Sequence, residues 1–160
     1  MAAYASHNAL DSNVKSAAVT LLNARVADAI DLALAIKQAH WNLKGREFIA
    51  IHEMLDDLRG DVDDYVDTMA ERAAALGGIA IGTVQAVAEK TTLAPYPTDL
   101  HAIEAHLRAL VERTAVVGNA VRQNIDAAAE AGDANTADVF TEVSRGLDKW
   151  LWILESHLPA

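Results

Sequence analysis

The sequence contains no cysteine, and this absence excludes several kinds of chemistry. Without thiols the 160 residues can form no disulfide framework, zinc–cysteine module, iron–sulfur cluster or cysteine nucleophile. Long hydrophobic runs are also missing. No stretch reaches the roughly 18 uninterrupted apolar residues of a membrane span, and the first 30 residues lack the basic start and apolar run of a secretory signal. We therefore expect a cytoplasmic domain that does not contact a membrane.

Basic residues are few, with 13 Lys and Arg against 23 Asp and Glu, which gives a net charge of −10. Such a surface repels phosphate groups and attracts cations, so simple electrostatic binding to nucleic acid is disfavoured. The ends of the chain do not compensate, because residues 1–14 and the segment after Trp152 contain no lysine or arginine. The content of hydrophobic residues, 52%, is high enough to form a folded core and excludes a disordered chain.

Proline and glycine are scarce, and their positions mark the ends of the expected helices. The stretch Asn13–Lys44 contains neither residue, and its apolar side chains recur at steps of three and four, the period of an amphipathic helix. A second run with the same period begins near Glu47 and ends at Gly77–Gly78. The short turn between these runs predicts an antiparallel helical hairpin.

The second half of the chain repeats this arrangement after a long connection over residues 79–98, which contains a short helical stretch around Val84–Glu89. A third helix is expected from Thr98 or Asp99 to Gly132, and a fourth from Asp133 or Asn135 to near the end. We predict an all-α fold, a ferritin-like four-helix bundle with a short helix in the long crossover between its second and third helices. The bundle domain is expected over residues 13–160, after a short tail over residues 1–12.

A stripe of polar residues follows one face of the second expected helix. Its members, at spacings of 4, 7, 4 and 4, are His52, Asp56, Asp63, Asp67 and Glu71. A four-residue step places two side chains on the same side of consecutive turns, as two ligands of one metal require, and His52/Asp56 and Asp67/Glu71 are two such pairs. Taken alone, each pair is more readily explained as part of a solvated acidic face. His40, which the hairpin brings level with His52, is likewise more readily explained as a packed core histidine.

The separation of the two pairs limits how they can be used together. Asp56 and Asp67 are 11 residues apart, about 16 Å along a helix, so they cannot share an ion within one chain. Two copies of the helix packed antiparallel across a two-fold axis would instead form two equal sites, each built from both subunits. No glutamate is followed three residues later by histidine, so the Glu-x-x-His motif of an internal di-iron centre is absent. Imidazole with carboxylates and no thiolate suits iron(II) or manganese and tolerates zinc.

His40 and the two pairs, His52/Asp56 and Asp67/Glu71, lie in three segments that resemble the signature of the Dps family: Lys37–Gly45, Phe48–Asp56 and Asp67–Arg72. The members of this family are the mini-ferritins named as DNA-binding proteins from starved cells. The similarity covers nearly the whole chain past about residue 12. It also includes Gly77–Gly78, Tyr96–Thr98, Thr136–Asp138 and Leu147–Trp152.

The resemblance implies a ferroxidase that assembles into a hollow dodecamer. Iron(II) would be oxidised at each dimer interface, preferentially by hydrogen peroxide, and the ferric mineral stored in the cavity, which protects the cell against oxidative damage. The catalytic and metal-binding residues implied are His40, His52 and Asp56 from one subunit with Asp67 and Glu71 from its two-fold partner.

Other residues receive two interpretations each. The resemblance places Trp41 beside the iron site, where it would affect electron transfer, whereas a core aromatic at a helix end is as reasonable. It also suggests a negative pore where three subunits meet, lined by acids near the turn between the third and fourth helices: Asp126, Glu130, Asp133 and Asp138. The other interpretation is that Asp133 is a helix cap and the remaining three are solvated. His101, Glu104 and His106 are better explained as part of a surface helix.

The family name implies DNA binding, but the sequence lacks the basic tail that members use for it, so we expect weak or absent DNA binding. An alternative function is a nucleoid-associated, DNA-compacting protein with secondary iron binding, and a third is a purely structural bundle without metal. The third leaves unexplained why ligand-type residues satisfy the two-fold geometry.

Overall fold

Four long helices, rich in alanine and with apolar rows at helical spacing, account for most of the chain. The computed structural model describes residues 4–159, and its helices are α1 (Ser12–Asn42), α2 (Phe48–Ala75), α3 (Val84–Lys90), α4 (Ile103–Glu130) and α5 (Ala134–Glu155). Within that range there is no strand, only an isolated bridge between Lys44 and Ala102. None of the described helices is long and apolar enough to cross a membrane.

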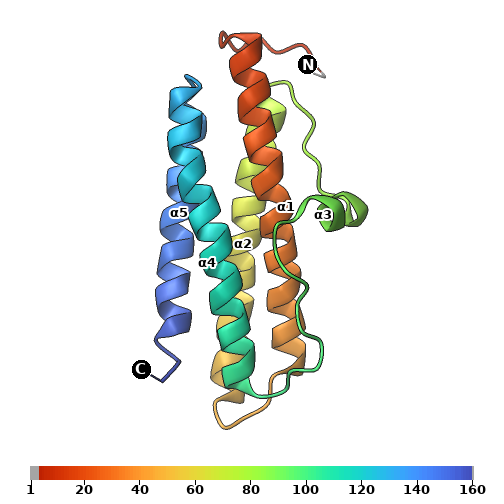
Figure 1. Ribbon diagram of the computed structural model, residues 1–160, viewed down its shortest axis with the longest axis vertical. Coiled ribbons are helices and arrows are strands. Elements are labelled where there is room, and N and C mark those ends of the chain that lie inside the picture. The colour runs from red at the N-terminus through yellow and green to blue at the C-terminus, as the bar shows by residue number, and fades with distance from the viewer. Residues whose placement is uncertain (1–3, 160) are drawn as a thin grey trace.

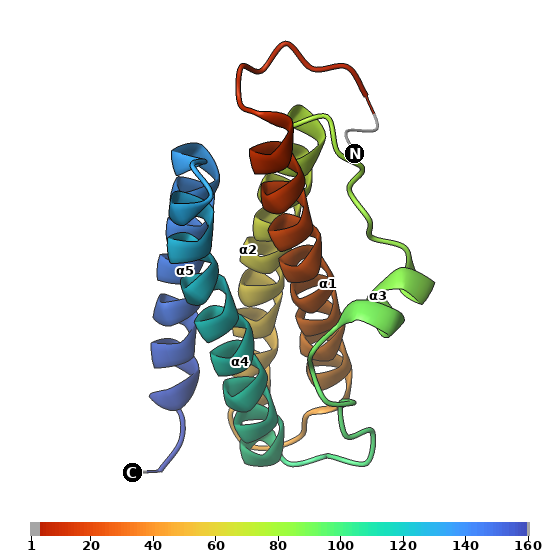
Figure 2. The same cartoon turned by 45° about the horizontal axis from the view of Figure 1, so that its top comes forward.

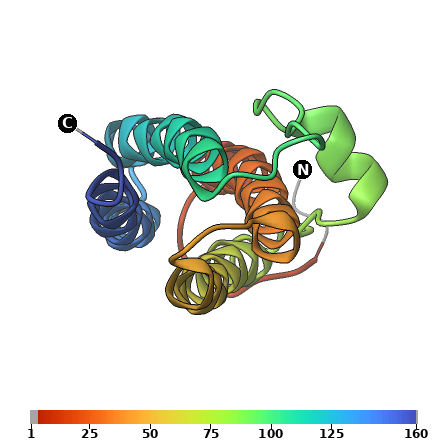
Figure 3. The same cartoon turned by 90° about the horizontal axis from the view of Figure 1, so that it is seen from below.

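The long helices form two antiparallel hairpins, α1–α2 and α4–α5, joined by a crossover that runs the length of the bundle (Figure 1). Seen from below, α3 lies outside the four-helix arrangement, against α1 (Figure 3). This confirms the predicted all-α, ferritin-like bundle with a short helix in the crossover. The apolar rows of the four helices meet in one core, whose largest fully buried side chains include Leu22, Ile36, Leu55, Leu58, Leu110 and Phe140.

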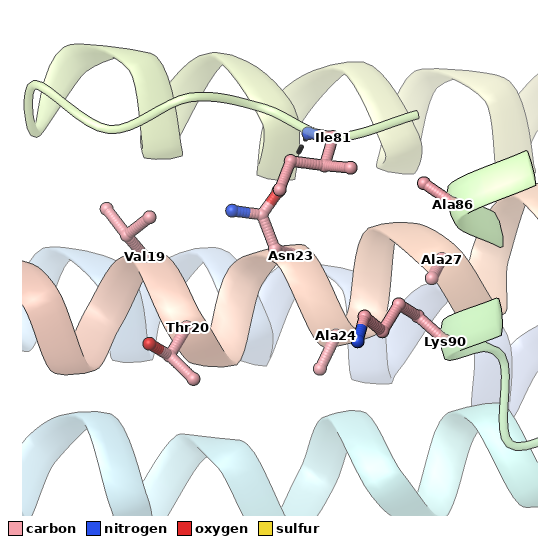
Figure 4. Close-up of a pocket in the computed structure, with 8 residues that line it drawn as sticks. All are labelled: Val19, Thr20, Asn23, Ala24, Ala27, Ile81, Ala86 and Lys90. Carbon is pink, nitrogen blue, oxygen red and sulfur yellow. Dashed lines mark hydrogen bonds between the residues drawn. The ribbon is translucent and has the colours of Figure 1, made fainter. Parts of the chain in front are cut away.

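Side chains of α1 form hydrogen bonds with backbone groups of the crossover between α2 and α4, in place of a neighbouring strand. Asn23 donates to the carbonyl of Ile79 at 2.9 Å and accepts from the amide of Ile81 at 2.8 Å, beside a pocket of about 410 Å³ (Figure 4). Further along, the buried carboxylate of Asp28 accepts from the amide and the hydroxyl of Thr92 at 2.7 and 3.0 Å. Side chains of α1 thus supply partners to three backbone groups of a crossover that forms no ladder.

The described part of the N-terminal tail passes over the end of α2 (Figure 2). The amide of Tyr4 donates to the carbonyl of Gly77 at 3.1 Å, and the hydroxyl of Ser6 donates to the carbonyl of Ala75 at 3.2 Å. These bonds satisfy carbonyls that the last turn of a helix leaves without partners.

The start of α4 differs from the prediction, which placed the cap three or four residues before the observed N-cap, Ala102. The expected cap was Thr98 or Asp99, but the helix begins at Ile103. The reason is a backbone pairing: Lys44 in the α1–α2 turn donates to the carbonyl of His101 at 2.8 Å and accepts from the amide of Ile103 at 3.3 Å. These bonds hold Ala102 extended against the turn, and the helix starts at the next residue.

His106 also differs from its expected position on a surface helix, because only 1% of it is exposed. Its Nε2 lies 3.1 Å from the carbonyl oxygen of Leu100 and its Nδ1 lies 2.8 Å from the hydroxyl of Tyr96. A carbonyl only accepts, so Nε2 carries the proton and Nδ1 accepts from the tyrosine. Burial lowers the pKa of His106 and raises the pKa of Tyr96 to about 12, so both are neutral and hold the end of the crossover on α4. His101 and Glu104 are exposed, as expected.

A buried ion pair joins α2 to the turn between α4 and α5. Arg72 donates to both carboxylate oxygens of Asp133, at 2.8 and 2.9 Å, and to the hydroxyl of Thr136 at 3.0 Å. Asp133 also accepts from the amide of Thr136, so it is the N-cap of α5, as one of the two predicted starts proposed. Burial acts to raise the pKa of Asp133, but its hydrogen bonds from Thr136 and the charge of Arg72 outweigh this and hold the pKa below its usual value.

Candidate metal centre

Three potential metal ligands meet where α1 ends and α2 begins. One ligand atom each from His40, His52 and Asp56 lies within 4.8 Å of the others, the only such group of three or more in the described chain. His40 is buried, His52 is half-buried and Asp56 is exposed, so the cluster opens to the surface at its carboxylate.

The two histidines are locked together by a reciprocal pair of hydrogen bonds. Nδ1 of His40 lies 2.9 Å from the carbonyl oxygen of His52, and Nδ1 of His52 lies 3.0 Å from the carbonyl oxygen of His40. Because both acceptors are carbonyls, both Nδ1 atoms carry protons, and in the neutral rings Nε2 keeps its lone pair. The rings stack with their centroids 3.6 Å apart. Each imidazole is thus fixed in the tautomer that offers Nε2 as a ligand.

The short α1–α2 turn brings the two histidines together. Leu43, just after α1, is buried, and the following Gly45 lies so close to α4 that an added Cβ would be 2.9 Å from the side chain of Ile103. A bulkier residue at this position would therefore require the end of the Ile103 side chain to move. The sequence predicted that a tight hairpin would bring His40 level with His52, and the structure confirms it. His40 is buried, so it has the position of a packed core histidine and is at the same time a member of the cluster.

Asp56 has a cationic partner. The ammonium of Lys37, one turn before His40 on α1, donates to Oδ1 of Asp56, and the same oxygen lies 3.4 Å from Nδ1 of His40. The hydrogen bond from Lys37, together with the nearby His40, holds the pKa of Asp56 below its usual value. Asp56 is therefore a carboxylate at neutral pH. Lys37 had no role in the sequence interpretation, and the only signal was its three-residue spacing from His40.

Asp67 and Glu71 do not join this cluster. Both are exposed and lie further along α2, where the helical rise places Asp67 about 16 Å and Glu71 about 22 Å from Asp56. Asp63, between the two pairs, accepts from Arg59 at 2.7 Å. Three donors from one chain leave a metal with open coordination positions, and exposed carboxylates on the same helix face are chemically suited to fill them in another copy.

Large apolar side chains border the cluster on the surface. Trp41 is 69% exposed, so the interpretation of this residue as a core aromatic is wrong. Phe48 and Ile49 are exposed too, and the ring of Phe48 lies 5.0 Å from the ring of His52. Exposed aromatic and aliphatic residues grouped around a polar site are typical of surfaces that another protein covers.

The acids considered for a pore separate into two groups. Asp126, Glu130 and Asp138 are exposed, whereas Asp133 is 2% exposed and bonded to Arg72 and Thr136. The interpretation of Asp133 as a pore-lining residue is therefore wrong, and its role as a helix cap is confirmed.

A family model described as a ferritin-like domain matches residues 19–159. The "DNA protection during starvation protein" of Agrobacterium fabrum is 52% identical over 158 residues, which cover 99% of this chain and 98% of that protein.

Solved structures agree with the sequence comparison. The structure of Mycobacterium smegmatis Dps in a tetragonal form superposes with a TM-score of 0.92 at 30% identity and covers 98% of this chain and 95% of that one. The structure of Dps from Microbacterium arborescens in the high iron form gives a TM-score of 0.85 at 37% identity, over 92% of this chain and 95% of that one.

Proposed function

Because this chain belongs to the Dps family of ferritin-like proteins, we propose that it is a ferroxidase that removes iron(II) and stores it as ferric mineral. The observation that carries the proposal is the cluster of His40, His52 and Asp56, in which each imidazole directs Nδ1 to a carbonyl oxygen and leaves Nε2 as its metal-binding nitrogen. A relative was solved in a high iron form, which supports iron as the substrate. Zinc or manganese would be accepted by the same donor set.

We assign the remaining ligands to a second copy of the chain. The partner's Asp67 and the partner's Glu71 would face His52 and Asp56 across a two-fold axis, so that each dimer holds two equal sites. Two facts support this arrangement. Both acids are exposed, and so are the apolar side chains of Trp41, next to His40 in the chain, and Phe48, whose ring lies 5.0 Å from that of His52. Trp41 would then lie beside the iron, in reach for electron transfer.

The proposed reaction uses hydrogen peroxide as the preferred oxidant. Two iron(II) ions each lose one electron, and one peroxide accepts both electrons with two protons and leaves as two water molecules. Imidazole nitrogens and carboxylate oxygens are suitable ligands for iron(II), and carboxylates stabilise the higher charge of iron(III). Because both electrons reach one peroxide, no hydroxyl radical is released, which accounts for protection against oxidative damage.

The storage part of the proposal concerns the assembly. We propose a hollow dodecamer in the cytoplasm, whose cavity takes up the ferric product. The exposed acids near the α4–α5 turn, Asp126, Glu130 and Asp138, would attract iron(II) toward openings in this shell. The net charge of −10 on each chain also attracts iron(II) to the shell.

The function itself is tested on the unmodified protein. Metal-free protein is loaded anaerobically with iron(II) and receives one addition of peroxide while ferric absorbance is followed. We expect oxidation complete within the mixing and reading time, at one peroxide per two iron ions, and slower oxidation when air replaces peroxide. Protein-free buffer is the control. Soluble ferric product that elutes with the protein supports storage, whereas a rate equal to that in buffer contradicts the ferroxidase assignment.

DNA binding is expected to be absent, although the Agrobacterium relative is named for DNA protection. Each chain has a charge of −10, and the first 14 residues contain no base that could contact phosphate. In a gel shift at about 0.15 M salt without magnesium, we expect the DNA to migrate as if free. A matched variant with four lysines inserted after Met1 should retard the same DNA. A retarded complex with the unmodified protein would favour the nucleoid-compacting alternative.

A further inference from the structure

Lys37 occupies the position where a metal would first meet the cluster. Its side chain is 26% exposed and that of Asp56 is 51% exposed, and the ammonium donates to Oδ1 of Asp56 at the open side of the site. The same oxygen faces His40 at 3.4 Å. The carboxylate oxygen nearest to the histidines is therefore bonded to a cation that belongs to the chain itself.

An ammonium that donates to this oxygen opposes the binding of a divalent metal to the same carboxylate. An ammonium offers three donors and no lone pair, so it can never be a ligand, and its positive charge repels an incoming cation at contact distance. Lysine is a flexible, strongly hydrated point charge, and a partly exposed lysine can move its ammonium into water at small cost. Metal binding at Asp56 is therefore disfavoured while the ammonium stays at this oxygen.

We propose that Lys37 is a resident counter-cation that lowers the affinity of the cluster for divalent metal and leaves when metal binds. This inference rests on the proposed function, since it assumes that His40, His52 and Asp56 bind metal. In this role the Lys37 ammonium compensates the negative charge of Asp56 while the site holds no metal. In the proposed dimer, Asp56 faces the partner's Asp67 and the partner's Glu71, and the ammonium partly neutralises this group of acids when no metal is present.

The direction of the expected change separates this role from a structural one. If Lys37 only ties α1 to α2, its removal loosens the cluster and weakens metal binding. If Lys37 competes with the metal, its removal strengthens metal binding.

The experiment is calorimetric titration of Zn²⁺, which is not oxidised, into metal-free protein at neutral pH. We expect Lys37→Met to bind Zn²⁺ roughly fivefold more tightly than the unmodified protein, since a partly exposed ion pair must be broken in one case only. Lys37→Arg, which keeps the charge, should bind as weakly as the unmodified protein or more weakly. Lys90→Met is the matched control. It also removes one ammonium and one ion pair, with Glu89 on exposed α3, and should change the affinity less than twofold.

His52→Ala distinguishes failure of this inference from failure of the proposed function. If His52→Ala weakens Zn²⁺ binding at least tenfold and Lys37→Met leaves it equal or weaker, the metal site stands and the role of Lys37 is wrong. If His52→Ala leaves binding unchanged, the cluster is not the metal site, and both proposals are contradicted. A second readout is the melting temperature. Without metal, Lys37→Met should melt at a lower temperature than the unmodified protein, and with saturating Zn²⁺ it should melt at a higher temperature than the unmodified protein with saturating Zn²⁺.

Discussion

A one-to-one mixture of His52→Ala and Asp67→Ala subunits is expected to recover about one quarter of the wild-type rate of iron oxidation, although each variant alone is inactive. Half of the randomly formed dimers contain both variants. In such a dimer, one of the two sites takes its His52 from the Asp67→Ala subunit and its Asp67 from the His52→Ala subunit, so it is intact. The other site has lost both residues. One quarter of all sites are therefore intact.

The expected loss in each single variant is large. Replacing even the groups that orient metal ligands costs about 10- to 100-fold, so loss of a ligand should lower the initial rate by about 100-fold or more. The measurement is ferric absorbance after one addition of peroxide to anaerobic, iron-loaded protein. The subunits are mixed by unfolding and refolding together.

Asp63→Ala is the matched control for this experiment. Asp63 lies on the same stripe of α2 between the two proposed ligand pairs, but it is exposed and paired with Arg59 at 2.7 Å. It should oxidise iron at close to the wild-type rate. Activity that stays lost in the mixture would contradict a site shared between two subunits, and activity retained in the single variants would exclude these residues as the site.

Arg72→Ala is expected to lower the free energy of unfolding by about 3 kcal/mol, because it leaves a buried carboxylate without its charged partner. The Arg72 side chain is mostly buried, Asp133 is almost fully buried, and the pair is the link between α2 and the α4–α5 turn. For a chain of this size the loss corresponds to a fall of about 6–12 °C in melting temperature. Arg108→Ala, which breaks the exposed pair with Glu104, should change stability by about 0.5 kcal/mol or less.

The pH dependence of this effect follows from the carboxylate. The pKa of Asp133 is lower in the folded protein than its value of 3.8 in the unfolded chain. Its contribution to stability is therefore complete above about pH 5 and is lost as the pH falls below 4 toward the folded pKa. The difference in melting temperature between the unmodified protein and Arg72→Ala should be constant from pH 7 to 5 and shrink below pH 4. A constant difference down to pH 3 would contradict this account.

The helices and the core could be predicted because their signals are local. Apolar residues at three- and four-residue steps specify which face of each helix is buried, and Gly45 and Gly77 mark where the first two end. The proximity of His40 and His52 was predictable for the same reason, because only a short turn separates their helices. The apolar face of α2 also left Asp67 and Glu71 exposed, as the spacing indicated.

The features that were missed depend on contacts between distant parts of the chain. α4 starts late because Lys44 pairs with residues 101–103, and no pattern within residues 98–103 reveals a partner in another turn. His106 is buried because the crossover brings Tyr96 over it, although its own helical spacing suggested a surface residue. The bond between Lys37 and Asp56 depends on how α1 is aligned against α2, which sequence periodicity does not determine to within one turn.

The position of the histidine cluster within one hairpin has a consequence for the order of folding. His40 and His52 are 12 residues apart, whereas the Arg72–Asp133 and Asp28–Thr92 contacts each close loops of about 60 residues. Closing a short loop costs less chain entropy, and local contacts form faster than distant ones. The α1–α2 hairpin, with both imidazoles already paired, is therefore expected to form before the rest of the chain has reached its tertiary contacts. A nascent subunit would thus possess its half of the site before it possesses a bundle.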